Sequence, residues 1–193
     1  MVPAEIVEFE VRTGAIDGLL VVTPKQITDD RGTIRELFRR SAFEAAGVHL
    51  APFRQINITE SALGSVRGMH AEHMTKLLTV VAGEVLGAYV DLRPDSPSFR
   101  QVETVELRPG VQVLVPAGVA NGFQALTVGC QYVYCFDAEW TPTMSGLACT
   151  PLDPALGHIW PIPIDPDDPA QISAKDRDAP LLADVADLEQ GAP

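Results

Sequence analysis

The sequence predicts a mainly β protein, built as an antiparallel sandwich or small barrel with a few short helices. Short runs rich in β-branched and aromatic residues follow one another through the middle of the chain, with turn residues between them. The runs recur at intervals of roughly 8 to 12 residues, a spacing typical of antiparallel sandwiches and barrels. The 15 Gly and 16 Pro, spread along the chain, supply the turns that such a fold needs.

Seven apolar runs account for the predicted strands. In chain order they are LLVVTPKQI (19–27), RQINIT (54–59), KLLTVVAGEVLGAYVDLR (76–93), QVETVEL (101–107), VQVLVPAG (111–118), NGFQAL (121–126) and CQYVYCFDAEW (130–140). Gly83-Glu84 divides the third run into two strands, and Arg108-Pro109-Gly110 separates the fourth run from the fifth. Such residues are typical of tight turns, so both positions predict β-hairpins.

A short helix is predicted at SAFEAAG, residues 41–47. Ser41 is the expected N-cap, Glu44 is its capping-box partner, and Gly47 is the C-terminal stop. From Pro151 onward the chain is rich in Pro and Asp, which predicts extended loop with about two helical turns.

Composition limits the class of protein. The length of 193 residues fits one domain, which we place at residues 1–180, followed by an acidic C-terminal tail at 181–193. No apolar run reaches the roughly 18 residues of a membrane span, and the N-terminus lacks a signal peptide, so we expect a cytoplasmic protein without a membrane partner. The net charge of −12 argues against nucleic acid as a partner. Three cysteines without a CxxC pair predict buried, reduced thiols.

The stretch SVRGMHAEHMTK, residues 65–76, gathers two histidines, an arginine and a lysine in an otherwise acidic chain. A metal site is disfavoured, because His70 and His73 point to opposite faces of an ideal strand and His49 and His158 lie in predicted loops. A histidine that ends a strand at a cavity, with an ordinary pKa of about 6.5, suits proton transfer near neutral pH. His70 fits that role. The alternative is a histidine that only satisfies a hydrogen bond at the rim of the fold.

Two other residues have both a structural and a chemical interpretation. Alternation along CQYVYCF places four side chains on one strand face, namely Cys130, Tyr132, Tyr134 and Phe136. Such a stripe is usually core, but a hydroxyl of Tyr134 that reaches a cavity can act as a general acid opposite a histidine base. Asp176 forms a capping-box-like pattern with Ser173 at the start of a helical turn, which is a structural role.

Eight segments, taken together in chain order, carry a family resemblance. They are DDRG (29–32), RQIN (54–57), VRGMH (66–70), VDLRPDSPSF (90–99), VPAGVANGF (115–123), VYCFDAEW (133–140), DPALGHIWP (153–161) and ISAKDRDAP (172–180). In this order they resemble the dTDP-4-dehydrorhamnose 3,5-epimerase family of nucleotide-sugar epimerases. The resemblance implies a cupin-type jelly roll that works as a homodimer, without a metal or other cofactor. It also implies a nucleoside-diphospho-4-keto-6-deoxy sugar as substrate, with dTDP-4-keto-6-deoxyhexose as the first choice, inverted at C3, C5 or both.

The resemblance also implies roles for individual residues. His70 would be the base, oriented by Asp176, and Tyr134 the opposing acid. The 4-keto group acidifies the protons at C3 and C5, so their removal forms an enolate, which Lys76 would stabilise. The substrate-binding residues implied by the resemblance are Arg31, Glu36, Gln55, Asn57, Arg67, Asn121 and Trp140.

Departures from the family pattern bear on the substrate. Asn121 replaces a second active-site histidine, Ile34 replaces an aromatic residue that stacks on thymine, and Trp140 stands where tyrosine is usual. The loop before Lys76 is also short, as in a subset that acts on GDP-linked 4-keto-6-deoxy heptoses or hexoses. Three alternatives stand beside the epimerase: a 3,4-ketoisomerase of the same fold, a noncatalytic sugar-nucleotide binding protein, and a metal cupin oxygenase. Asn121 and the spacing of His70 and His73 disfavour the last of these.

Overall fold

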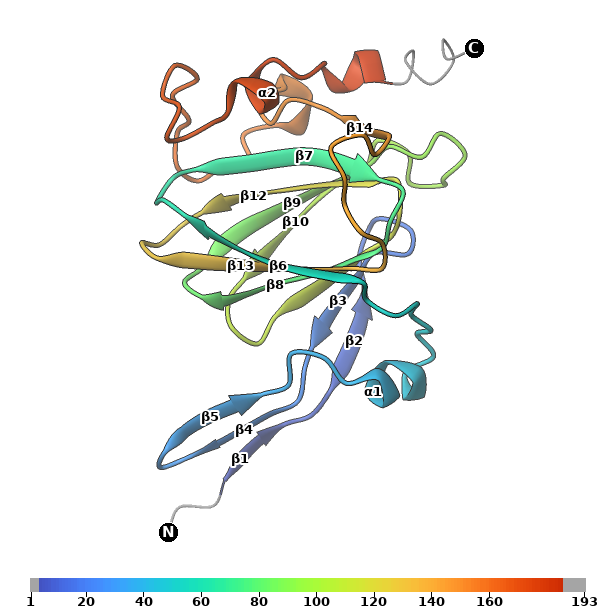
Figure 1. Cartoon of the computed structure of the whole chain (residues 1–193), viewed down its shortest axis with the longest axis vertical. Coiled ribbons are helices and arrows are strands. Elements are labelled where there is room, and N and C mark those ends of the chain that lie inside the picture. The colour runs from blue at the N-terminus through green and yellow to red at the C-terminus, as the bar shows by residue number, and fades with distance from the viewer. Residues whose placement is uncertain (1–3, 186–193) are drawn as a thin grey trace.

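Residues 4–185 are described by a computed structural model, in which three antiparallel sheets make up most of the chain (Figure 1). The largest sheet has six strands, in the order β2 (Glu10–Thr13), β3 (Leu20–Thr23), β11 (Gln112–Val115), β8 (Lys76–Ala82), β13 (Cys130–Phe136) and β6 (Gln55–Ser61). The second sheet has five strands, in the order β10 (Val102–Leu107), β9 (Val85–Asp91), β12 (Val119–Ala125), β7 (Val66–Glu72) and β14 (Gly146–Ala148). The third, with β1 (Glu5–Val7), β4 (Gln26–Asp29) and β5 (Gly32–Arg35), projects from the lower end of the other two. The predicted mainly β, antiparallel fold is confirmed.

The two larger sheets face each other and enclose the main core. Leu78 and Tyr132 from the six-stranded sheet belong to the same buried cluster as Tyr89 and Phe123 from the five-stranded sheet, and all four side chains are inaccessible to solvent. The rings of Phe123 and Tyr132 stack with centroids 4.1 Å apart and planes 6° from parallel. This stack joins the sheets directly.

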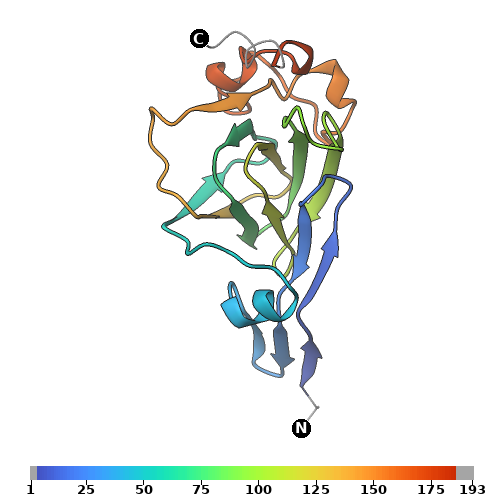
Figure 2. The same cartoon turned by 90° about the vertical axis from the view of Figure 1, so that its right-hand side faces the viewer.

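Each larger sheet is also covered on its outer face. The helix α1 (Arg40–Ala45) packs Phe43 against the six-stranded sheet, while the C-terminal segment, with η1 (Pro154–Leu156) and α2 (Ala174–Arg177), lies over the five-stranded sheet (Figures 1 and 2). Because both faces are covered, β9 and β12 are buried along their whole length.

The boundary expected at residue 180 falls inside packed structure. Leu182 and Val185 belong to the buried cluster on the outer face of the five-stranded sheet, with exposures of 5% and 2%. The rest of the expected tail, residues 186–193, lies outside the described residues.

Both predicted hairpins are wrong, although both turns exist. The strands on either side of Gly83-Glu84 are β8 and β9, which belong to different sheets, and so do β10 and β11 on either side of Arg108-Pro109-Gly110. Each turn is a corner where the chain crosses between sheets. The physical reason lies in the burial of β8 and β9, since strands that are apolar on both faces can each occupy the middle of a separate covered sheet.

The predicted helix is present, but its N-cap is wrong. Arg39 is the N-cap residue, without a side-chain capping bond, so Ser41 lies inside the first turn. Gly47 follows the C-cap with a φ of 78°, as expected of a C-terminal stop. The side chain of Arg40 donates to the carbonyl of Leu50 at 2.9 Å, a contact that the capping pattern does not reveal.

Two expectations from composition can be compared with the structure. Cys130, Cys135 and Cys149 are free and buried, as predicted. Among residues 4–185 there is no helix long and apolar enough to cross a membrane.

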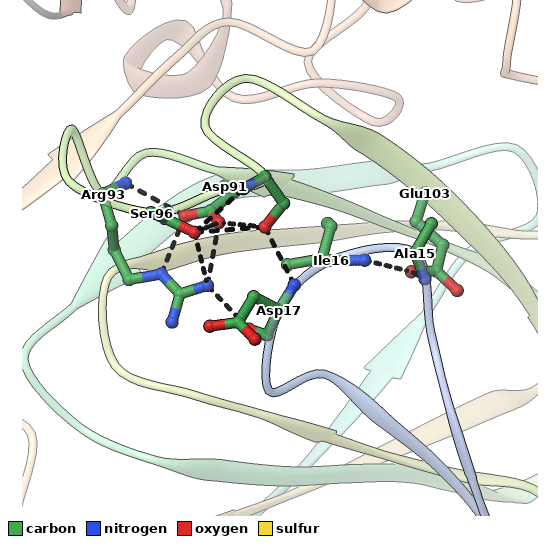
Figure 3. A network of polar contacts seen from close by, with 8 residues as sticks. Ala15, Ile16, Asp17, Asp91, Arg93, Ser96 and Glu103 are labelled. Carbon is green, nitrogen blue, oxygen red and sulfur yellow. Dashed lines mark hydrogen bonds and ion pairs between the residues drawn. The ribbon is translucent and has the colours of Figure 1, made fainter.

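A buried polar network closes one corner of the barrel (Figure 3). The fully buried carboxylate of Asp91 accepts hydrogen bonds from the Arg93 guanidinium at 2.8 Å and from the hydroxyls of Ser96 at 2.5 Å and Ser98 at 2.6 Å. Arg93 also donates to the carbonyl of Asp17 at 2.7 Å, and the Asp17 amide donates to Ser98 at 2.8 Å. The network therefore ties the loop after β9 to the loop between β2 and β3, which belong to opposite sheets.

Because of the Asp91 network, the free energy of unfolding should depend on pH in the acid range. Burial opposes ionisation of Asp91, but the hydrogen bonds outweigh it and lower its pKa from 3.8 to about 2. A lowered folded-state pKa contributes stability above pH 4 that is lost as the pH falls toward 2. At pH 7 we expect Asp91→Asn to reduce the free energy of unfolding by about 1–2 kcal/mol, with a smaller difference from the parent in acid.

Urea unfolding at pH 7 and again at acid pH measures this effect. Asp95→Asn, which changes an exposed carboxylate of the same loop, is the matched control and should leave stability unchanged. A constant difference between the Asp91→Asn variant and the parent from neutral to acid pH would contradict the linkage.

Candidate active site

A large cavity lies at the open edge between the two larger sheets. Its volume is about 620 Å³, and its walls come from β6, β7, β13 and the segment 169–176. A recess of about 60 Å³ adjoins it, and five residues line both spaces: Arg67, His70, Glu72, Tyr134 and Phe136. Lys76 and Asn121 line the recess only.

His70 lies on the β7 wall, paired with a buried carboxylate. Its Nε2 is 2.7 Å from Oδ1 of Asp176, which lies on α2 and is 6% exposed. Ser173 caps α2 through the Asp176 amide at 3.1 Å, so the predicted capping pattern also holds the carboxylate in place. Burial opposes ionisation of Asp176, but its hydrogen bond with His70 contributes to the net lowering of its pKa. One ring nitrogen of His70 is thus held, which leaves the other for proton transfer.

A β-bulge directs both Arg67 and His70 into the cavity. Asn121 pairs with His70 and Phe123 pairs with Arg67, so β7 has one residue more than β12 between these pairs. The extra residue offsets the alternation of side chains, which otherwise places residues three apart on opposite faces. Gly68 makes the bulge possible: its φ is 111°, and a Cβ there would lie 2.6 Å from the Asn121 carbonyl oxygen.

Substitution of Gly68 should therefore be costly. We expect Gly68→Ala to lower the free energy of unfolding by about 2 kcal/mol or more, since it adds a steric clash to the strain of a positive φ. Gly129→Ala is the matched control, because Gly129 has a φ of 71° but no atom within 4 Å of its Cβ position. Chemical denaturation of both variants provides the measurement. Equal losses would show that crowding at β12 does not fix the bulge.

Tyr134 faces His70 from the opposite sheet. It lies on β13 of the six-stranded sheet, whereas His70 lies on β7 of the five-stranded sheet, and both line the cavity. The predicted stripe is confirmed: the Tyr134 ring lies between those of Tyr132 and Phe136, at centroid distances of 4.8 and 5.5 Å. Burial raises the pKa of the Tyr134 phenol, which keeps it protonated and able to donate a proton.

Lys76 is a buried cation at the floor of the recess. Its side chain is among the buried polar groups, with a residue exposure of 3%. Nζ donates to the carboxylate of Glu72, to the side-chain oxygen of Asn121, and to the His70 carbonyl at 3.2 Å. Burial lowers the pKa of Lys76, and the charge of Glu72 acts in the opposite direction.

The structure brings three of the seven predicted binding residues to this cavity and a fourth, Asn121, to the adjoining recess. Asn57, Arg67 and Trp140 line the cavity. Gln55 does not line the cavity, but it donates to Asn57 at 3.1 Å and accepts from the Trp140 amide at 2.7 Å. Gln55 is therefore a support of the wall.

Arg31 and Glu36 do not line the cavity of their own chain. Arg31 lies in the turn between β4 and β5 on the projecting sheet, paired with Asp29 at 2.6 Å, and Glu36 follows β5 and is paired with Arg39. His73 lines a separate hollow of about 180 Å³. Within residues 4–185 no group of three or more His, Cys, Asp or Glu is placed to hold a metal ion.

Several cavity residues were not predicted. They are Thr59, Ser65, Val66, Glu72, Phe136, Pro169, Ala170, Gln171, Ile172, Ser173 and Lys175. Four of them carried a usable signal. Thr59, Glu72 and Phe136 each lie two residues after a predicted site residue on the same strand face, after Asn57, His70 and Tyr134 respectively, and Lys175 precedes Asp176. The others come from segments whose approach to the cavity depends on the tertiary fold.

Comparison with known proteins gives consistent matches. A family model described as dTDP-4-dehydrorhamnose 3,5-epimerase matches residues 13–184. The chain is 34% identical over 176 residues to the dTDP-4-dehydrorhamnose 3,5-epimerase of Pseudomonas aeruginosa, covering 89% of this chain and 94% of the relative. It is 33% identical over 175 residues to the dTDP-4-dehydro-6-deoxyglucose 3-epimerase of Streptomyces bikiniensis, covering 88% and 87%.

Solved structures agree with the sequence matches. A 4-keto-6-deoxy sugar epimerase from the novobiocin biosynthetic gene cluster of Streptomyces spheroides superposes with a TM-score of 0.85 at 30% identity, covering 98% of this chain and 94% of that one. A dTDP-6-deoxy-D-glucose-3,5-epimerase from Legionella pneumophila, solved in complex with dTDP-4-keto-L-rhamnose, gives a TM-score of 0.81 at 32% identity, covering 91% and 94%. The expected cupin-type jelly roll is therefore confirmed.

Proposed function

Because the chain belongs to the dTDP-4-dehydrorhamnose 3,5-epimerase family, we propose that it is an isomerase that epimerises a dTDP-4-keto-6-deoxyhexose. One observation carries the chemical part of the proposal: a His-Asp pair and a tyrosine face each other across one cavity, from opposite sheets. Inversion of a carbon centre needs proton removal on one face and proton return on the other, and this arrangement provides both.

The reaction can be written with these groups. His70 takes the proton from C3 or C5, and the C–H electron pair moves into the sugar, so that O4 becomes an enolate oxygen. Asp176 balances the imidazolium that forms. Lys76, at the floor of the recess, supplies positive charge to O4. Tyr134 then returns a proton from the opposite face, which inverts the carbon.

The cavity also fits a nucleotide sugar. Two cations, Arg67 and Lys175, line it and suit a diphosphate. Trp140 lines the same cavity with 44% exposure and offers a flat surface for a base. The relatives named above act on dTDP-linked sugars at C3 alone or at C3 and C5, and Asn121 at the recess is the residue on which we expect that choice to depend.

A homodimer is part of the proposal. Exposed apolar side chains occur on the projecting sheet, with Ile34 at 72%, and on the edge strand β6, with Ile56 at 60% and Ile58 at 63%. Such surfaces favour association, and a second copy would allow Arg31 and Glu36 to reach a cavity that their own chain does not offer them. We expect light scattering to give twice the mass of one chain for the parent and a single chain for Ile56→Glu/Ile58→Glu.

Proton NMR in D₂O tests the function. We expect dTDP-4-keto-6-deoxyglucose, incubated with chelator-treated protein, to take up deuterium at C3, C5 or both, with inversion. A product with its carbonyl moved to C3 would indicate a 3,4-ketoisomerase. Exchange only with a GDP-linked sugar would mean that the substrate carries GDP in place of dTDP. Binding without exchange would overturn the enzymatic proposal in favour of a binding protein.

A further inference from the structure

We propose that Glu72 is a positioning residue that holds the Lys76 ammonium, as a cation, at the recess beside the acid and the base. This inference rests on the proposed function, because its consequence is stabilisation of the enolate. Glu72 lines both the cavity and the recess and contacts Lys76 directly.

The hydrogen bonds of Lys76 fix the position of its charge. An ammonium group has three N–H donors, and the structure supplies three acceptors: the Glu72 carboxylate, the Asn121 side-chain oxygen and the His70 carbonyl. Two acceptors come from β7, and the third comes from β12, which pairs with β7 at His70. The ammonium is therefore anchored to the same strand as the catalytic base.

The charge balance at the recess explains why a carboxylate is needed. The titratable groups that line the recess with Lys76 are Arg67, His70 and Glu72 from β7 and Tyr134 from β13, while β12 offers the neutral Asn121. Of these, Glu72 is the one carboxylate. Burial alone lowers the pKa of Lys76, and Glu72 raises it. Without Glu72, the lysine would lose its proton at lower pH and its stabilising charge with it.

The position of Glu72 on β7 links it to catalysis more closely than to folding. Glu72 and His70 are two residues apart on one strand and both line the cavity. The strand thus holds the base, His70, and the partner of Lys76, Glu72, at a fixed separation. A substrate carbonyl that enters the recess approaches a lysine that is already charged and held in place, so its positive charge is present when negative charge develops on O4.

Lysine NMR tests the hold of Glu72 on Lys76 without any turnover. The chain has only three lysines, Lys25, Lys76 and Lys175, so three Cε signals of ¹³C-labelled protein can be assigned with Lys→Arg variants. We expect the Lys76 signal of Glu72→Gln to titrate about one pH unit or more below that of the parent. In Glu72→Gln/Asn121→Asp, which moves the carboxylate to another acceptor of Lys76, the midpoint should rise again. Glu60→Gln, an exposed glutamate on β6, is the matched control.

The pH profile of deuterium exchange tests the catalytic consequence. For Glu72→Gln we expect the alkaline limb to move to lower pH with the Lys76 midpoint, with about a tenfold loss of rate for each pH unit above it. In the double variant the limb should return to higher pH, whatever its maximal rate. An unchanged midpoint would overturn the proposal, and so would a shifted midpoint with an unmoved exchange profile. If the parent showed no exchange, the proposed function would fail, while the NMR titration would still decide whether Glu72 holds Lys76 charged.

Discussion

The His70→Asn variant should lose about a thousandfold of its deuterium-exchange rate at C3 and C5, while it binds dTDP as tightly as the parent. General acid–base groups contribute about 10²- to 10⁴-fold to catalysis, and an amide cannot take a proton from carbon. Binding should survive because Arg67, Lys175 and Trp140, which we assign to the nucleotide, are unchanged. NMR measures the rate of deuterium exchange, and calorimetry measures the affinity for dTDP.

The chain provides a matched control for this result. His73 lies three residues further on and lines a separate hollow, so His73→Asn should exchange deuterium at the parent rate. Asp176→Asn should fall between the two, because the imidazole can still take a proton but loses the carboxylate that orients it and balances its charge. If His70→Asn weakened binding and exchange by the same factor, His70 would be a structural histidine at the rim.

Local sequence rules predicted the elements better than their connections. Alternation in CQYVYCF placed Tyr134 beside Tyr132 and Phe136 on one face, as found, because a period of two is intrinsic to a strand. The corners at Gly83-Glu84 and Arg108-Pro109-Gly110 do not form the predicted hairpins, because a tight turn has the same residues whether the next strand pairs in the same sheet or in the opposite one.

The site shows the same division between local and tertiary information. The side-chain rule for an ideal strand separates residues three apart, yet Arg67 and His70 both line the cavity because a bulge at Gly68 lies between them. The contact between His70 and Asp176 joins residues 106 positions apart, and no spacing in the sequence reveals it; the family resemblance supplied that pair. The resemblance was not informative about Glu72, whose importance depends on the burial of Lys76.

Substitution of Tyr134 should separate proton removal from inversion. In D₂O we expect Tyr134→Phe to slow inversion by about 10²- to 10³-fold, since the acid on the β13 wall is gone. Proton removal by His70 does not use the phenol, so deuterium should still enter from the His70 face with configuration retained. Time courses of label and of product stereochemistry, read from the same NMR spectra, distinguish the two processes.

Tyr132 provides the matched control for this prediction. It lies two residues away on the same face of β13, is fully buried, and its hydroxyl has no hydrogen-bond partner within the described chain. Tyr132→Phe therefore removes a hydroxyl from the core without touching the cavity, and should leave exchange and inversion at the parent rates. Equal loss of exchange and inversion in Tyr134→Phe would mean that the phenol assists proton removal as well. Unchanged inversion would mean that the returning proton comes from another group, since His70 can deliver one only to the face from which it took it.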